Sequence, residues 1–217
     1  MEPIILASGS PRRQEFFRLL GLPFTCIPAA IDETPPPGLS PQQAAEAIAQ
    51  RKALAVAERS YSSLPKNLRV LRVPRASVRG SFPHWILAAD TIVVLDNEIL
   101  GKPANKDNAR CMLKQLSGRQ HEVITAMALC NTQRNTERAT LDCRSAVSEV
   151  TFAPLSGAEI EWYLDTGEWE GAAGAYRLQE LGACLIESIK GSPSGVAGLP
   201  LHDLYCMLRD NGYPFGA

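Results

Sequence analysis

Short apolar runs alternate with helical patterns along this chain, and this alternation constrains its fold more than any other feature of the sequence. The apolar run at residues 3–7 leads through a Ser-Gly-Ser-Pro turn directly into a helical pattern, which ends at Gly21. The same change of period recurs almost to the end of the chain. Strands that alternate with helices predict an α/β architecture, in which helices cover a mixed sheet.

The expected elements follow from the spacing of the apolar residues. Strands are predicted at residues 24–27, 85–95, 98–100, 122–130, 143–152 and 183–190. Further helices are predicted at residues 40–57, 105–116, 156–164 and 199–211, the last with Pro200 in its first turn. The segment 31–38 holds three consecutive prolines and a glycine, so it is predicted to be a loop.

Composition narrows the class of protein. The 217 residues include 22 Lys and Arg against 23 Asp and Glu, a net charge of −1, and 45% of them are hydrophobic. A general nucleic-acid binder carries a basic surplus, and a disordered chain has few apolar residues, so both classes are excluded. The length predicts one domain. No stretch reaches the roughly 18 apolar residues of a membrane span, so a membrane partner is not expected.

Cysteine usage and the start of the chain predict a cytoplasmic protein. None of the six cysteines forms a C-x-x-C pair, and several stand within apolar runs. This pattern is typical of reduced thiols buried as small apolar groups. The first residues carry no basic region ahead of their apolar patch, so we expect a strand there rather than a signal peptide.

One stretch, residues 60–84, breaks the alternation. It contains three prolines and five Lys and Arg residues, with no acidic residue among them. We expect a basic, extended surface insertion within the single domain. A solvated charge run and an arm that binds phosphate or nucleic acid both fit this composition, and solvated runs are the commoner case.

The first helix begins differently from the others. Two later helices begin with Ser followed three residues on by Gln or Glu, which is the capping-box pattern. The first helix instead reads Ser-Pro-Arg-Arg at residues 10–13, although a cation at a helix N-terminus costs roughly 0.3–1 kcal/mol. Arg12, Arg13, the Ser8 hydroxyl and free N–H groups together predict a phosphate cradle. The alternative is a surface helix that happens to begin with basic residues.

Lys52 stands on the inward face of its predicted helix. At 100° per residue it projects between Ala45, Ile48 and Val56, while polar residues occupy the opposite side. An inward lysine either extends its ammonium group back to solvent or meets an anion, because a buried unpaired ammonium is costly. The second alternative makes Lys52 a candidate site residue.

A single carboxylate, Asp90, interrupts the apolar strand predicted at residues 85–95. A buried carboxylate must neutralise, or pair with a lysine, a metal or backbone amides. Carboxylates in such places often serve as general bases or metal ligands, and a purely structural Asp is the alternative. Lys102 follows the next short strand and could return to this strand's end as a phosphate partner.

A polar residue, Gln179, follows a glycine-rich turn near the end of the chain. Its amide offers both the donor and the acceptor that reading a base edge requires. Gln179, the cradle, the lysines and Asp90 together predict a cleft for a phosphorylated small molecule, with a carboxylate able to activate water.

The same residues carry a family resemblance. The motifs LASGSPRR, IDET, AADTIVV, GKP, LSGRQHEVITA, GAYRLQ and VAGLPL occur in this order and cover nearly the whole chain except residues 60–84. The chain resembles the Maf family of nucleoside triphosphate pyrophosphatases. The resemblance implies a mixed, elongated sheet in two lobes around a central cleft, similar to inosine triphosphatases. It also implies hydrolysis of a nucleoside triphosphate to the monophosphate and pyrophosphate with a divalent metal (Mg, Mn or Co).

The resemblance assigns roles to individual residues. Asp90 matches the family's proton acceptor, and Gln179 in its GAYxxQ context is similar to the branch that acts on dTTP and UTP. The positions that set substrate choice are matched by Arg12, Thr91 and Gln179, and the polar cleft positions by Glu33, Lys52 and Lys102. In the resulting hypothesis Asp90 activates water and Glu33 helps to hold the metal. The basic residues Arg12, Arg13, Lys52 and Lys102 stabilise charge on the phosphates.

Three residues depart from the family pattern, namely Ala172, Glu180 and Gly195, and they bear on efficiency and base preference. Two other functions are considered: a pyrophosphatase for 7-methyl-GTP or deaminated purine nucleotides, and a non-catalytic nucleotide-binding regulator of cell division. Related proteins are commonly dimers, so the resemblance also implies a homodimer. A stable nucleic-acid partner is not expected.

Overall fold

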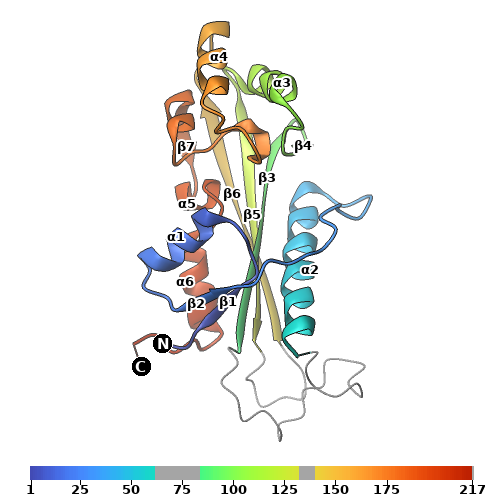
Figure 1. Cartoon of the computed structure of the whole chain (residues 1–217), viewed down its shortest axis with the longest axis vertical. Helices are drawn as coiled ribbons and strands as arrows, with labels where there is room; N and C mark the ends of the chain where they lie inside the picture. The colour runs from blue at the N-terminus through green and yellow to red at the C-terminus, as the bar shows by residue number, and fades with distance from the viewer. Residues whose placement is uncertain (62–83, 132–139, 217) are drawn as a thin grey trace, which may run out of the picture.

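The computed structural model describes residues 1–61, 84–131 and 140–216, and it has the α/β architecture that the sequence predicts (Figure 1). The strands are β1 (Ile4–Leu6), β2 (Phe24–Cys26), β3 (Trp85–Leu95), β4 (Glu98–Leu100), β5 (Gln120–Asn131), β6 (Thr140–Phe152) and β7 (Ile186–Lys190). The α-helices are α1 (Pro11–Leu19), α2 (Pro41–Tyr61), α3 (Lys106–Leu116), α4 (Gly157–Asp165), α5 (Pro193–Val196) and α6 (Leu201–Asp210). Two 3₁₀ helices are η1 (Ala173–Ala175) and η2 (Leu181–Leu185).

The described strands form one mixed sheet in the order β2-β1-β3-β5-β6-β7, with β4 paired to β3 beside this path. Among these described strands, β1 alone makes parallel pairs, with β2 and β3, and the other pairs are antiparallel. The long strands β3, β5 and β6 run along the longest axis of the molecule (Figure 1). The sheet is therefore both mixed and elongated, as expected.

Helices cover the sheet in two lobes. In the lower lobe of Figure 1, α2 covers one face of the sheet, and α1 and α6 cover the other. In the upper lobe, α3 and α4 pack with the far ends of the long strands around Leu113, Phe152 and Tyr163. Successive residues of a strand point to opposite faces, so Trp85 faces α1 and α6, while Ile86 faces α2.

The strand β3 changes neighbours at the boundary between the lobes. On one edge it pairs with β1 through residues 85–87 and with β4 through residues 93–95. Between these ladders, no described strand lies along the edge at residues 88–92. A paired strand would fill this place, so the sheet itself leaves an opening there, and Asp90 and Thr91 stand in the middle of it.

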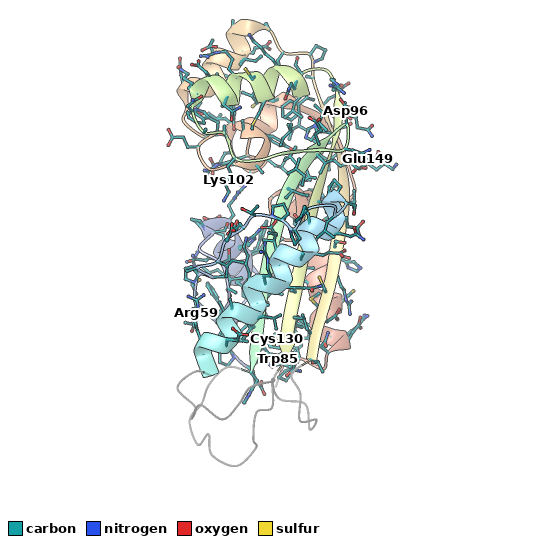
Figure 2. The ribbon with its side chains drawn as sticks, turned by 90° about the vertical axis from the view of Figure 1, so that its right-hand side faces the viewer. Arg59, Trp85, Asp96, Lys102, Cys130 and Glu149 are labelled. Carbon is teal, nitrogen blue, oxygen red and sulfur yellow. The ribbon has the colours of Figure 1, made fainter. Side chains whose placement is uncertain are left out.

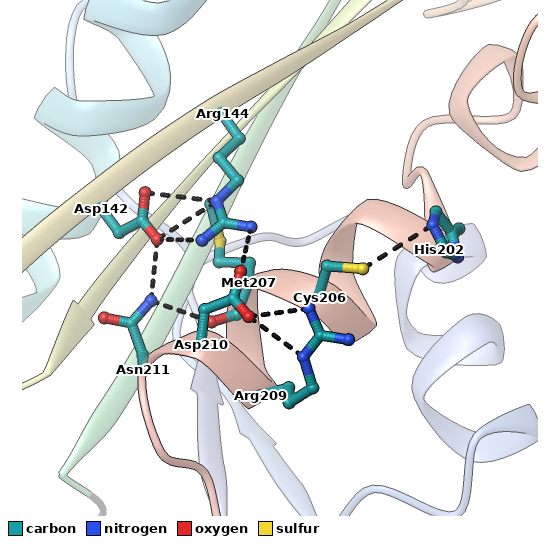
Figure 3. Close-up of polar contacts among 8 residues, drawn as sticks. All are labelled: Asp142, Arg144, His202, Cys206, Met207, Arg209, Asp210 and Asn211. Carbon is teal, nitrogen blue, oxygen red and sulfur yellow. Dashed lines mark hydrogen bonds and ion pairs between the residues drawn. The ribbon is translucent and has the colours of Figure 1, made fainter.

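A polar network fastens the end of α6 to strand β6 (Figure 3). The Arg144 guanidinium bonds Asp142 at 2.9 Å and Asp210 at 3.0 Å, and the Asn211 amide donates to Asp142 at 2.7 Å. These charges are partly exposed, so each pair contributes little alone. Their shared arrangement fixes where α6 lies against the sheet.

Several predicted boundaries are wrong, for identifiable reasons. Strand β7 begins at Ile186 rather than at residue 183, because the preceding five residues form η2. Pro200 lies before α6 in extended conformation, so it is outside the first turn. The helix α5, with four residues, is too short to show a period. The predicted insertion at residues 60–84 lies outside the described residues, except for the end of α2 and His84.

The thiols and the helices bear on two further expectations. All six cysteines are free, but burial is confirmed only for Cys130, while Cys111 and Cys184 are exposed. The surroundings raise the pKa of Cys130 to about 11 by desolvation. Among the helices described, none has the length and apolar character needed to cross a membrane.

Candidate active site

A cavity of about 820 Å³ opens between the two lobes at the gap in the edge of β3. This volume lies within the range of small-molecule sites. We call it the cleft. Its walls come from the loop before α1, the inward face of α2, the centre of β3, the turn after β4 and the segment around η1. Segments far apart in sequence therefore meet at one place, where the predicted site residues also gather.

On the α2 side of the cleft, one ammonium group joins two carboxylates. The Lys52 Nζ lies 2.7 Å from Asp90 Oδ1 and 3.0 Å from Glu33 Oε1. Lys52 is buried, as its helical position predicts, and its charge is met by anions rather than by solvent. No hydrogen bond in the described part of the chain uses Asp90 Oδ2, whose side chain is 13% exposed.

The loop that carries Glu33 is tied to the same helix. Asp32 Oδ1 accepts a hydrogen bond from the Thr34 backbone N–H at 2.8 Å, which forms a local turn. Hydrogen bonding to the Thr34 side chain, and then to its backbone, lowers the pKa of Asp32. Arg51 donates to the Thr34 carbonyl at 2.7 Å. The neighbours Arg51 and Lys52 thus hold the loop from α2, and the Glu33 carboxylate stays half exposed at the cleft.

On the opposite face of the sheet, the described residues hold Arg13 by neutral acceptors alone. Its Nε donates to the Gly198 carbonyl at 2.9 Å, and its two terminal nitrogens donate to Ser8 Oγ and Thr91 Oγ1, each at 3.1 Å. Burial lowers the pKa of Arg13 to about 10, an effect that nearby Asp90 opposes, so it stays charged at neutral pH. Among the described residues, no carboxylate lies within ion-pair distance of it. The Arg13 guanidinium is therefore available to bind an anionic group of a ligand.

The N-terminus of α1 opens on the cleft without a side-chain cap. Ser10 makes no capping bond, whereas Ser156 and Glu159 of α4 form a complete capping box. Ser40 and Gln43 bond reciprocally in the same way. The first turn of α1 has no acidic residue either. Free backbone N–H groups at such a terminus attract anions. This agrees with the phosphate cradle that the first residues of this helix predict.

A chain of polar contacts links the lobes at the rim of the cleft. Arg12 donates to Gln179 Oε1 at 3.3 Å, and Gln179 Nε2 donates to Glu180 Oε1 at 3.4 Å. Glu180 also lies 3.6 Å from Arg177. Burial, and then the charge of Arg177, lower the pKa of Arg12. Gln179 itself is exposed beside the cleft, and both ends of its amide are engaged.

Lys102 approaches from the upper lobe. Figure 2 shows its side chain extending from the turn after β4 toward the lower lobe, and it lines the cleft. The turn is fastened because the Gly174 N–H donates to the Gly101 carbonyl at 3.1 Å. Gly174 has φ of 66°, and a Cβ there would lie 2.9 Å from a Val93 methyl, so only glycine fits. Lys102 makes no ion pair with any described residue.

An aromatic cluster supports the cleft from behind. Tyr176 lines the wall, and its hydroxyl lies 2.9 Å from Nε2 of the buried His121. The rings of His121, Tyr176 and Phe152 meet edge to face, with centroids 4.9–5.5 Å apart. Desolvation lowers the pKa of His121 to about 4, so the ring is neutral at physiological pH.

The structure brings nearly all of the predicted residues to one cleft. Its walls include Ser8, Arg12, Arg13, Glu33, Lys52, Asp90, Thr91 and Lys102, with Gln179 beside them through Arg12. Prediction from sequence missed Thr125, which bonds Thr91, and gave no role to Arg177. Thr125 could have been found as the one hydroxyl in the run Val123–Cys130, as Asp90 was found in its own strand.

The family model described as Maf-like protein matches residues 3–211 of this chain. The chain belongs to the Maf family. The sequence resemblance is thereby confirmed. In this Maf chain, residues of the family motifs lie around the cleft between the two lobes of the sheet.

Curated relatives match the Maf chain over almost its whole length. A dTTP/UTP pyrophosphatase of Symbiobacterium thermophilum is 43% identical over 214 residues, which cover 99% of this chain and 96% of the relative. Proteins of the same name from Anaeromyxobacter dehalogenans and Halalkalibacterium halodurans are 41% and 40% identical, each covering at least 95% of both chains. The Staphylococcus aureus Ham1 protein has a TM-score of 0.44 at 11% identity, over 97% of this chain and 100% of that chain.

The neutral, buried His121 predicts how the stability of this Maf chain changes with pH. Between pH 6.5 and 4 the unfolded chain binds a proton at this residue that the folded chain does not. The free energy of unfolding therefore falls as the pH is lowered, by about 2 kcal/mol between pH 7 and pH 5 for this group. Urea unfolding of the wild type and His121→Gln should show that loss only in the wild type. Equal pH dependence in the two proteins would contradict the assignment.

Proposed function

We propose that this Maf protein hydrolyses dTTP and UTP to the nucleoside monophosphate and pyrophosphate. The observation that carries the proposal is the charge arrangement of the cleft. Arg13 is a positive charge that only neutral acceptors satisfy within the described part of the chain, and it lies across β3 from the Asp90 carboxylate. The names of the relatives at about 40% identity support the same activity and the same pyrimidine substrates.

The distribution of cations suits a triphosphate. Lys52 is neutralised by its two carboxylates, but Arg12, Arg13 and Lys102 have no carboxylate within ion-pair distance among the described residues. They come from both lobes and face one cavity. A triphosphate supplies several negative charges along a short chain, so it can satisfy cations from both lobes at once. The free N–H groups of α1 add a further anion site.

Asp90 is the group that we propose as proton acceptor. Lys52 donates to Oδ1 and fixes the direction of the carboxylate, which leaves Oδ2 for a water molecule. Asp90 would take a proton from this water as its oxygen attacks phosphorus, and Arg12, Arg13 and Lys102 would stabilise the charge that develops on the phosphates. The alternative, a purely structural ion pair, leaves the free oxygen at the cleft unexplained.

The donor chemistry of the cleft fits a divalent cation such as Mg, Mn or Co. Glu33 presents a half-exposed carboxylate, whose Oε1 meets Lys52 while Oε2 is not used by any described residue. Mg²⁺ is commonly bound through one or two carboxylates together with the phosphates of its substrate. Among the described residues, no group of three or more His, Cys, Asp or Glu side chains could hold a metal ion. When bound, the metal would neutralise phosphate charge, and Glu33 would hold it.

A panel of nucleotides tests the proposed activity. Pyrophosphate release should be fastest with dTTP and UTP and slower with ITP, GTP and 7-methyl-GTP, and it should stop when the metal is removed with EDTA. Preference for 7-methyl-GTP or ITP would replace the pyrimidine proposal with one of the purine alternatives. Binding measured by calorimetry without turnover under Mg²⁺, Mn²⁺ or Co²⁺ would instead indicate a non-catalytic regulator.

Replacing the proposed base should abolish most of the activity. Asp90→Asn keeps an oxygen that can accept from Lys52, so the fold should be retained, but the amide cannot take a proton. Loss of a general base costs about 10²–10⁴ in rate, so kcat for dTTP should fall at least about a hundredfold. Asp96→Asn is the matched control, because Asp96 is an exposed turn residue that pairs with Arg119 and does not line the cleft. Near-native turnover by Asp90→Asn would remove Asp90 from the role.

Removing the rim amide should mainly relax base choice. Gln179→Ala takes away the acceptor of Arg12 and one link between the lobes. A hydrogen bond between the Gln179 amide and the nucleotide base would contribute about 0.5–1.5 kcal/mol, so the ratio of kcat/KM for dTTP to that for GTP should fall by roughly 2- to 13-fold. Gln115→Ala, at an exposed position of α3, should leave this ratio unchanged. An unaltered ratio in Gln179→Ala would count against its role in specificity.

A further inference from the structure

A buried hydroxyl outside the cleft contacts one acceptor of Arg13, Thr91, and the segment that carries another, Gly198. Thr125 lies on β5 directly opposite Thr91 in the antiparallel register, and it is fully buried. Its Oγ1 lies 2.9 Å from Thr91 Oγ1 and 2.8 Å from the Gly195 carbonyl oxygen. It does not line the cleft, so it cannot touch a bound nucleotide.

The direction of each hydrogen bond in this row can be worked out. The Gly195 carbonyl has no proton, so the single proton of the Thr125 hydroxyl is donated to it. Thr91 must therefore donate its own proton to Thr125. The oxygen of Thr91 then accepts from Arg13, whose nitrogen is only a donor. The row runs in one direction, from Arg13 through Thr91 and Thr125 to Gly195, and such rows strengthen cooperatively.

The direction of the row limits what its members can offer a substrate. Thr91 lines the cleft, but its proton is already used by Thr125, so toward a nucleotide its hydroxyl can only accept. Arg13 uses three of its five N–H groups on Gly198, Ser8 and Thr91, which leaves one on each terminal nitrogen. Because three bonds fix the plane of the guanidinium, these two N–H groups have a defined direction.

Thr125 also supports Arg13 by a second route. Gly195 belongs to α5, and the chain continues from there to Gly198, whose carbonyl accepts from Arg13 Nε. By holding Gly195, Thr125 fixes the start of the segment that carries this acceptor. One buried hydroxyl on β5 thus serves two of the three bonds that orient Arg13.

We propose that Thr125 is a positioning residue, which orients the Arg13 guanidinium toward the phosphates through Thr91 and through the Gly195–Gly198 segment. The proposal rests on the proposed function, because it names a further residue for that reaction. It deepens the role of Thr91, whose influence on the substrate would pass through Arg13 rather than through a bond donated to the nucleotide.

A matched pair of substitutions separates positioning from simple structural support. Thr125→Val keeps the shape of the side chain and removes its hydroxyl, while Thr125→Ser restores the hydroxyl. Ser148 is the control, because it is also buried and makes two bonds with Ser192, which precedes the Gly195–Gly198 segment. It bonds neither Thr91 nor Gly195 nor Arg13. Thermal unfolding of each variant confirms that it is folded at the assay temperature.

The expected result is a loss of catalysis beyond any loss of stability. Small misplacement of a catalytic group can cost about a hundredfold, so Thr125→Val should lower kcat/KM for dTTP by roughly 10- to 100-fold. Thr125→Ser should stay within about threefold of the wild type, and so should Ser148→Ala. Thr91→Val and Thr125→Val both interrupt one row of hydrogen bonds. In a double-mutant cycle, the loss of kcat/KM in the double variant should therefore be smaller than the product of the two single losses by about fivefold or more.

Calorimetric titration of dTTP in the Asp90→Asn background gives the second readout, in which Thr125→Val should weaken binding by about tenfold or more. Wild-type kcat/KM and affinity in Thr125→Val, or an equal loss in Ser148→Ala, would overturn the inference while leaving the proposed function intact. A wild type that binds dTTP without turnover would overturn the proposed function alone. In that case weaker dTTP binding by Thr125→Val would support the inference, and unchanged binding would overturn it. A wild type that neither binds nor hydrolyses dTTP would overturn both.

Discussion

The ammonium group of Lys52 is the contact on which one half of the cleft depends. It draws together a carboxylate from the centre of the sheet, Asp90, and one from an exposed loop, Glu33. Without this cation, two negative charges would face each other in a partly buried space, and the loop would lose its tie to the sheet. The position of Lys52 is set in turn by the alanine-rich face of α2, whose small side chains let the helix lie close to the strands.

The other half of the cleft follows from the alternation of a β-strand. Asp90 and Thr91 are neighbours in sequence, so they point to opposite faces of β3. One meets Lys52 on the α2 side, and the other meets Arg13 on the α1 side. Both can be reached from one cavity because no described strand pairs with β3 along this part of its edge. A carboxylate and an unneutralised guanidinium are thereby held at a fixed separation by two adjacent residues.

Sequence alone predicted the features in which a charge stands in an unfavourable place. Asp90 in an apolar strand, Lys52 on an inward helical face and arginines at a helix N-terminus are each unfavourable in isolation, so each indicated a partner. Thr125 carries no charge, and threonine is common in β-strands, so the pattern of its strand does not single it out. Its role required the strand register, which pairs it with Thr91. The engagement of Gln179 with Arg12 likewise depends on how the lobes meet, and no local pattern encodes that. The short helix α5 and the start of β7 were missed because segments of four or five residues show no reliable period.

The continuity of β3, β5 and β6 through both lobes also bears on how a nucleotide is selected. Their paired residues extend without interruption past the cleft, as in the ladder from Trp85–Asn131 to Val94–Glu122. The lobes therefore share one rigid backbone and cannot swing apart as hinged jaws do without breaking that ladder. Discrimination between nucleotides must then come from the preformed shape of the cleft and not from a closing motion of the lobes.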